Sequence, residues 1–225
     1  MSKLNLSLTQ PITPFFERFG TKIIYKPNQS FDRPEDSMQG VYLMIAGQAL
    51  IYTVKSDGIS QIIGMYEEGA VFARPGGLIN QPQIYQHLEA LTNCVVYRMP
   101  LDVFQTIYTT NKEFLGIYIK QIALMNMYIV ERVITLGEND ALKRIVRWLL
   151  FMEKYYGDTK GNQSTLRISL TQEQIASFTS LTRESVNKYL QLLKRKKQIK
   201  IQKGKISINN LEALRDQIDI LNTNP

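Results

Sequence analysis

Alternating apolar and polar residues dominate the first half of the chain. Apolar, β-branched runs separated by glycines occupy Val41–Ile45, Ala49–Val54, Ser60–Tyr66 and Leu88–Met99. Asp57-Gly58 lies between the second and third runs, and this dipeptide is typical of a tight β-hairpin turn. The pattern predicts short antiparallel strands that form a β-sandwich or roll over residues 20–105.

The hydrophobic period changes after Thr109. Apolar residues then recur at alternating spacings of four and three, which is the pattern of a coiled-coil seam over about three heptads. Asn126 falls on an a position, where a polar side chain selects register and oligomeric state. We expect a long helix through which two copies of the chain associate. The alternative is a helix packed only on its own domain. The seam residues are Leu115, Ile119, Ile122, Asn126, Ile129, Val133 and Leu136.

Two short helices separated by a tight turn are predicted in the last third of the chain. Thr171 is placed to cap the first helix, and Gln174 three residues later completes a capping box. Thr182 is placed to cap the second helix, Arg183–Lys194. The apolar stripe of this second helix consists of Val186, Leu190 and Leu193. Upstream, Gly137 and Asp140 lie at a predicted hinge before another helix, and a polar loop is expected over 157–165.

A predicted β-hairpin follows these two helices. Isoleucines alternate with polar residues on both sides of Lys203-Gly204, so the hairpin has a basic tip that can reach a phosphate or a minor groove. Helix, turn, capped helix and basic hairpin in this order predict a winged helix-turn-helix. The alternative is an ordinary helical hairpin with a solvated lysine face.

The charge distribution supports the first interpretation. The net charge of +7 is concentrated in residues 165–209, which contain ten Lys or Arg residues and only two acidic residues. Such a segment indicates a polyanionic partner. The start of the second helix exposes side chains of the types that read base edges, namely Arg183, Glu184, Asn187 and Lys188.

Thr171–Ala176 followed by Leu181–Val186 resembles the Crp/Fnr family of bacterial transcription regulators, whose recognition helix usually starts Ser-Arg-Glu-Thr-Val. Val41–Gly47 and Asp57–Phe72 are similar to the family's cyclic-nucleotide-binding-type roll. The resemblance implies an α+β chain with three parts. These are a β-roll (1–108), a dimerisation helix (109–137) and a winged helix-turn-helix DNA-binding domain (138–225).

The resemblance also implies roles for single residues of the predicted helix-turn-helix. Arg183, Glu184 and Lys188 match the family's base-contacting positions, and Thr171, Gln172 and Thr182 match its phosphate-contacting positions. Asn187 and Lys203 join the DNA-binding set because of their residue types and positions. Ser180 departs from the family, which often has glycine at this turn. A positive φ there would strain a serine.

The resemblance also implies an effector pocket, but with altered chemistry. Family members that bind cyclic AMP use a Gly-Glu pair for the ribose and an Arg-Ser pair for the phosphate. Here Ala73 and Arg74 stand at the first pair, and Ile84 and Tyr85 stand at the second. Because a cation replaces the carboxylate and isoleucine replaces the arginine, we expect no binding of cyclic AMP. The hypothesis is that Arg74 pairs with a small anionic effector, and the alternative is an internal salt bridge.

The chain has a single cysteine, Cys94, and a single histidine, His87, which restricts the metal, cofactor and catalytic sites it can form. An iron–sulfur cluster needs about four cysteines. His87 and Cys94 are expected on opposite faces of one strand, where they cannot act together. We therefore expect no metal, no cofactor and no enzymatic activity. Cys94 is expected to be a buried apolar residue, and a regulatory thiol stays open.

The sequence has no apolar run of membrane-spanning length and no secretory signal, and it fits a reducing cytoplasm. We expect a cytoplasmic homodimer that binds double-stranded DNA at a near-palindromic site and has no membrane partner. RNA polymerase is a further expected partner if the protein activates transcription. The alternative is a sensor module that docks an acidic protein through its basic C-terminal segment.

Overall fold

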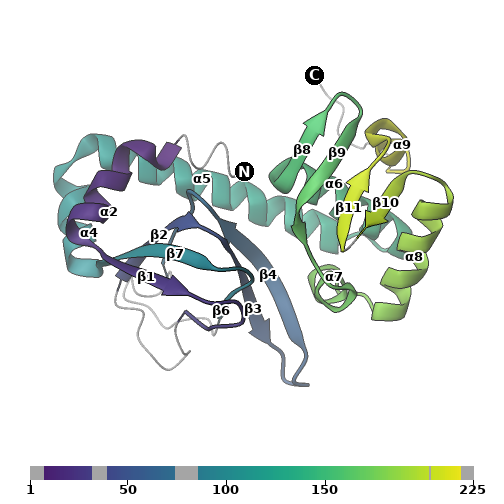
Figure 1. Cartoon of the computed structure of the whole chain (residues 1–225), viewed down its shortest axis with the longest axis horizontal. Helices are drawn as coiled ribbons and strands as arrows, with labels where there is room; N and C mark the ends of the chain where they lie inside the picture. Colours follow the sequence, from purple (N-terminus) through teal and green to yellow (C-terminus); the bar gives the residue numbers. More distant parts are fainter. Residues whose placement is uncertain (1–7, 32–39, 74–85, 203, 219–225) are drawn as a thin grey trace. The chain divides into compact units, whose positions relative to one another are not determined.

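The computed structural model of the chain describes residues 8–31, 40–73, 86–202 and 204–218. The chain forms two compact units that divide between Asn126 and Met127, within the long helix α5 (Lys112–Leu136). The first unit contains β-sheets and the second contains the helix-turn-helix (Figure 1). This organisation confirms the predicted α+β class, with a roll, a long helix and a C-terminal helix-turn-helix unit.

The first unit is built on two antiparallel sheets, with strand orders β1-β7-β2-β5 and β4-β3-β6. The hairpin between β3 and β4 turns at Asp57-Gly58 as predicted, where Gly58 has a φ of 79° and the Asp57 carboxylate accepts the Ile59 N–H at 2.9 Å. The strands are β1 (Thr21–Tyr25), β2 (Gly40–Ala46), β3 (Gln48–Val54), β4 (Ser60–Glu67), β5 (Val71–Phe72), β6 (His87–Ala90) and β7 (Cys94–Pro100).

Strand β2 is buried on both of its faces because side chains alternate across a strand. Tyr42 and Met44 pack into the cluster between the two sheets. Val41 and Leu43 face the other way and pack with Phe16 and with residues of the helices. The helices in this unit are η1 (Gln10–Ile12), α2 (Thr13–Phe19), α4 (Leu101–Thr110) and the first part of α5.

The prediction of one continuous strand over Leu88–Met99 is wrong. The run Leu88–Met99 divides into β6 and β7, because β6 pairs with β3 in one sheet and β7 pairs with β1 and β2 in the other. Between them the Gln48 carbonyl accepts the N–H groups of Leu91 and Thr92, at 2.8 and 3.2 Å. His87 and Cys94 therefore lie on different strands, rather than on opposite faces of one strand.

The second unit is a helical core covered by a four-stranded antiparallel sheet with strand order β10-β11-β9-β8. Trp148, Phe151 and Phe178 are buried at its centre, and their rings pack together. The elements after α5 are α6 (Ala141–Tyr156), β8 (Gly157–Lys160), β9 (Gln163–Ser169), α7 (Gln172–Thr179), α8 (Arg183–Arg195), β10 (Ile199–Gln202), β11 (Lys205–Ile208) and α9 (Leu211–Arg215).

The segment expected to be a polar loop over 157–165 is instead the hairpin of β8 and the start of β9. Gly161 and Asn162 form its two-residue turn, and Gly161 has a φ of 57°. Along β9, Ser164, Leu166 and Ile168 alternate with more exposed residues and are buried. Pairing of β9 with β11 completes the sheet, so the strand depends on residues about 40 positions away.

Candidate nucleic-acid interface

The first helix of the helix-turn-helix begins as predicted. The Thr171 Oγ1 accepts the Gln174 N–H at 3.1 Å, and the Gln174 Oε1 accepts the Thr171 N–H at 2.9 Å. This reciprocal capping box satisfies two donors that the first turn of a helix leaves free. It fixes the start of α7 and leaves Thr171 exposed.

The second helix, α8, also begins at its predicted cap. The Thr182 Oγ1 accepts the Ser185 N–H at 3.2 Å. The predicted inner stripe of α8 is confirmed, because Val186, Leu190 and Leu193 are each at most 2% exposed. The opposite face of the helix is open to solvent and presents Thr182, Arg183, Glu184, Asn187 and Lys188.

Two contacts join the exposed faces of α7 and α8. The Gln172 Nε2 donates to the Asn187 Oδ1 at 3.2 Å, and the Arg183 guanidinium lies 3.5 Å from the Glu173 carboxylate. Both members of the ion pair are largely exposed, so the pair contributes little to stability. These contacts place Asn187 beside Gln172 and Arg183 beside Glu173, so the exposed starts of α7 and α8 adjoin.

The turn between the two helices contains Ser180 in the left-handed region, with φ 53° and ψ 40°. Ser180 therefore has the positive φ that would strain a serine at this turn. The Leu181 N–H donates to the Ala176 carbonyl at 3.1 Å, which closes the turn at the end of α7. Serine holds a conformation here that glycine adopts more easily.

Two arginines that were not among the predicted site residues donate hydrogen bonds to backbone carbonyls at the end of α7 and in this turn. Arg132, on α5, is 6% exposed, donates to the Phe178 carbonyl at 2.8 Å and stacks over the Phe178 ring at 4.2 Å. Burial lowers the pKa of Arg132 to about 10, so the side chain remains a cation at neutral pH. Arg144, on α6, donates to the Thr179 and Ser180 carbonyls, each at 3.4 Å.

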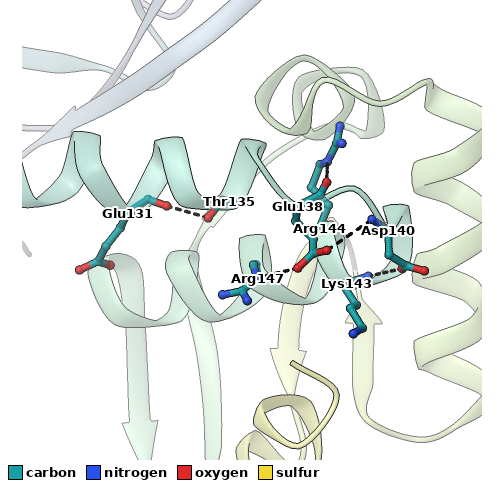
Figure 2. A network of polar contacts seen from close by, with 7 residues as sticks. All are labelled: Glu131, Thr135, Glu138, Asp140, Lys143, Arg144 and Arg147. Atoms are coloured by element: carbon teal, nitrogen blue, oxygen red, sulfur yellow. Dashed lines mark hydrogen bonds and ion pairs between the residues drawn. The ribbon is translucent and has the colours of Figure 1, made fainter. Parts of the chain in front are cut away.

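The predicted hinge between α5 and α6 lies within the polar network of Figure 2. The Glu138 carbonyl accepts from Arg144 at 2.8 Å, and the Glu138 carboxylate accepts from Arg147 at 3.0 Å. The hydrogen bond from Arg147 is the largest cause that holds the pKa of Glu138 below its usual range. Asp140 caps α6 by accepting the Lys143 N–H at 2.8 Å. Arg144 thus connects the Glu138 carbonyl directly to the helix-turn-helix turn.

The wing predicted from alternating isoleucines is the hairpin of β10 and β11. Ile199, Ile206 and Ile208 are buried under it. Lys203, expected at its basic tip, lies outside the described residues. The following cation, Lys205, is exposed on β11 beside Gly204, whose φ is 78°. Lys205 was not among the predicted DNA-contacting residues, although the same strand alternation places it with the exposed residues.

Along α5, the predicted seam forms an apolar stripe that is open to solvent in the single chain. Ile119 and Ile122 are 55% and 52% exposed, and Ile129 and Val133 are 48% and 62% exposed. Asn126 is also exposed, and Leu115 and Leu136, at the two ends of the seam, are half-buried. Large apolar side chains at these exposures are characteristic of an interaction surface.

Of the candidate effector residues in the roll, only Ala73 is described. It is half-buried and packs against the cluster that contains Val41 and Leu43. Arg74, Ile84 and Tyr85 lie outside the described residues. Cys94 is fully buried, donates from its Sγ to the Gln48 carbonyl at 3.1 Å, and has a pKa raised chiefly by burial.

A cleft that the sequence did not predict lies elsewhere in the roll. Its volume is about 380 Å³, and it lies between η1, the end of β2 and the link from β4 to β5. Ala73 does not line it. Within the described ranges, no group of three or more His, Cys, Asp or Glu residues could hold a metal ion. None of the helices in those ranges has the length and apolar character needed to cross a membrane.

A capped helix-turn-helix with a wing, joined through a long helix to a β-roll, defines a DNA-binding transcription regulator of the type that carries a cyclic-nucleotide-binding-like domain. Residues 143–217 match the Crp-like helix-turn-helix domain, and residues 22–111 match the cyclic nucleotide-binding domain. The chain belongs to the Crp/Fnr family. This family consists of transcription regulators, which are not enzymes.

Several curated proteins are similar to the chain over most of their length. A global nitrogen regulator of Synechococcus elongatus is 24% identical over 185 residues, which are 82% of this chain and 83% of that protein. The nitrogen fixation regulation protein FixK of Bradyrhizobium diazoefficiens is 24% identical over 200 residues, 86% of this chain and 80% of that protein.

Solved structures share the fold. FixK2 of Bradyrhizobium japonicum gives a TM-score of 0.74 at 19% identity, covering 88% of this chain and 96% of that chain. The c-di-GMP-responsive global regulator CLP of Xanthomonas campestris gives a TM-score of 0.71 at 18% identity, covering 89% of this chain and 98% of that chain. At these identities the likeness concerns the fold alone.

Proposed function

We propose that this regulator acts as a homodimer in the cytoplasm and reads a near-palindromic DNA site with α8. The observation that carries the proposal is the open face of α8, where Arg183, Glu184 and Lys188 point away from a helix that is otherwise firmly packed. Arginine and lysine suit guanine, and glutamate suits the amino group of cytosine. Two such helices in one dimer would enter successive major grooves about 34 Å apart.

The remaining members of the interface hold the DNA backbone in this proposal. Thr171, Gln172 and Thr182 lie at the starts of α7 and α8, where backbone N–H groups and the helix dipole favour a phosphate. Asn187 is a further base reader, beside Gln172, and Lys203 is assigned to the phosphates that flank the site. Backbone contacts position the protein, whereas base contacts select the sequence.

The proposed dimer contact is the exposed stripe of α5. Ile122, Ile129 and Val133 bury their apolar surface only when a second chain covers them, and burial of this kind drives association. Asn126 lies in the middle of the stripe. A buried asparagine at this heptad position selects a dimer in register over other assemblies.

Control by cyclic AMP is not part of the proposal, because Ala73 and Arg74 replace the pair that takes the ribose and Ile84 replaces the arginine that takes the phosphate. A small anionic effector that pairs with Arg74 is proposed in its place. Titration with cyclic AMP at micromolar concentration should leave the melting temperature unchanged, and stabilisation by it would contradict this part. An unchanged response of an Arg74→Ala variant in cells would contradict the anionic effector.

The experiment that tests DNA reading compares wild-type protein with Arg183→Ala. Loss of one base-reading side chain should weaken binding to the preferred duplex by about 1–3 kcal/mol and leave binding to random-sequence DNA nearly unchanged. The second candidate function is docking of an acidic protein through residues 165–209, which carry ten cations. That function predicts that Arg183→Ala has little effect and that no duplex sequence is preferred. RNA polymerase enters as a partner only if the regulator activates transcription.

A further inference from the structure

The last turn of α8 and the two residues after the helix form a run of four exposed cations. Lys194, Arg195, Lys196 and Lys197 are all exposed, and none of them forms an ion pair with a carboxylate among the residues that the structure describes. We call this run the basic end of α8. It lies outside the set of residues assigned to DNA above.

The helix dipole explains only part of this run. Cations in the last turn of a helix interact favourably with its free carbonyl groups, and Lys194 and Arg195 lie in that turn. Lys197 lies beyond the C-cap residue, Lys196, so its side chain is not needed to satisfy the end of the helix.

The backbone at Lys197 is strained. Its φ is 56°, in the left-handed region that glycine adopts at least cost. The Lys197 N–H donates to the Lys194 carbonyl at 2.9 Å, and the Gln198 N–H donates to the Leu193 carbonyl at 3.0 Å. This pair of hydrogen bonds is the Schellman motif, which usually has glycine at this position.

Glycine could form the same turn without the strain. Lys197 takes part in the hydrogen bonds of the turn through its backbone: its N–H donates to Lys194, and its carbonyl accepts from the Asn209 Nδ2 at 2.9 Å. Strain that the fold does not require points to a use of the side chain. The use consistent with four adjacent exposed cations is binding of a polyanion.

The length of α8 favours DNA phosphates as the polyanion. The helix has 13 residues and is about 20 Å long at 1.5 Å per residue. The major groove is about 12 Å wide, so a helix whose first two turns contact bases reaches the phosphates with its last turn. In Figure 1 the start of α8 lies beside α7 and its end lies beside α9. The Gln198 Nε2, which donates to the Ala213 carbonyl at 3.2 Å, fixes that second placement.

We propose that the basic end of α8 binds DNA phosphates beside the bases that the start of the same helix reads. It adds affinity for any DNA sequence and makes binding more dependent on salt, because each phosphate contact releases condensed counterions. The proposal rests on the proposed function, since it takes the groove position of α8 from there. The alternative is that an acidic protein binds the same surface, and the test must distinguish this from binding of DNA.

The first test removes three charges with Lys194→Gln, Arg195→Gln and Lys196→Gln together. The matched control removes three exposed lysines of the roll, Lys22, Lys26 and Lys55, by the same change. Binding is measured by fluorescence anisotropy between 50 and 200 mM salt on two duplexes, one selected from a random pool and one of random sequence. The slope of log K against log salt should become less negative by about 0.9 for each phosphate contact removed.

The expected affinity loss of the triple variant is the same on both duplexes, at least tenfold at the lowest salt, and the control should bind like the wild type. An unchanged slope overturns the proposal and leaves the surface to a protein partner. Failure of this proposal and failure of the proposed function give different results. If the wild type shows no preference between the duplexes, the proposed base reading fails, whereas the slope on random-sequence DNA still tests the phosphate contacts.

The second test uses Lys197→Gly, which removes the strain and the charge together. The melting temperature of this variant should rise, while its DNA affinity falls and its salt slope becomes less negative. Ser180→Gly is the matched control, because it relieves the same backbone strain in the same domain without changing the charge. It should raise the melting temperature and leave the slope unchanged. A Lys197→Gly variant that is more stable and binds DNA with the wild-type slope overturns the role of Lys197.

Discussion

Replacement of Ser180 by glycine should stabilise the DNA-binding unit. A residue with a Cβ at φ 53° and ψ 40° costs about 1–2 kcal/mol relative to an ordinary conformation. Glycine avoids this cost, but it also gives the unfolded chain more freedom, which offsets about 0.4–1 kcal/mol. The expected net gain in the free energy of unfolding is about 0.5–1 kcal/mol. For a domain of this size, that gain raises the melting temperature by roughly 2–6 °C.

The protein contains its own probe for this measurement. Trp148 is the single tryptophan of the chain, is 1% exposed, and packs 6.4 Å from the Phe178 ring at the end of α7. Its fluorescence during urea denaturation therefore reports unfolding of the second unit, separately from the roll. The midpoint should move to higher urea with an unchanged slope.

Ser180→Ala separates the backbone effect from the loss of the hydroxyl group. Alanine has the same steric cost in the left-handed region as serine and lacks the hydroxyl. The variant should be no more stable than the wild type, and Ser180→Gly should exceed it by more than 0.5 kcal/mol. Equal midpoints for the two variants would contradict the predicted strain, because they would show that the φ of 53° carries no cost.

Three further outcomes are expected. Thr171→Ala should lower the stability reported by Trp148 by about 1 kcal/mol, and Thr171→Ser should not, because serine keeps the cap; equal loss in both would contradict the capping role. Val133→Glu should convert a dimer to monomers in light scattering with an unchanged circular dichroism spectrum, since it places a charge in the exposed apolar stripe; a persistent dimer would refute the seam. Glu138→Gln should cost stability at neutral pH and progressively less in acid. The pKa of Glu138 is lower in the folded chain than in the unfolded chain, so its ionised carboxylate stabilises the fold above the unfolded-state pKa. This stabilisation is lost as the pH falls through the folded-state pKa. A pH-independent difference would contradict the ion pair with Arg147.

The helix-turn-helix was predictable because its determinants are local in sequence. The cap at Thr171 and its partner Gln174 are three residues apart, and the stripe of Val186, Leu190 and Leu193 follows the helical period. Each feature indicates the same structure within fewer than ten residues.

The elements that the sequence analysis missed depend on distant partners. Strand β9 is completed by pairing with β11, and the break between β6 and β7 arises because the two strands join different sheets. The hairpin of β8 and β9 did carry a local signal, the Gly161-Asn162 turn, which polar composition concealed.

The two arginines that bind the turn between α7 and α8 could not be predicted either, because their partners are also distant in sequence. Arg132 lies 46 positions before the Phe178 carbonyl that it binds, and Arg144 lies 35 positions before the Thr179 carbonyl. Neither spacing has a signature in the sequence, because the contacts arise only when α5, α6 and α7 pack together. A single cation among apolar residues, as at Arg132, is the one available signal that such a contact exists.

Sequence-specific DNA binding by paired α8 helices is tested most directly by selection of bound sequences from a random duplex pool at near-physiological salt. Wild-type protein without added ligand and Arg183→Ala are selected in parallel. The wild type should enrich a near-palindrome whose half-sites are about 34 Å apart, and Arg183→Ala should lose the preference at one base position in each half-site. A wild-type pool that shows no enriched sequence, or that is identical to the Arg183→Ala pool, would contradict the claim that α8 reads DNA in pairs.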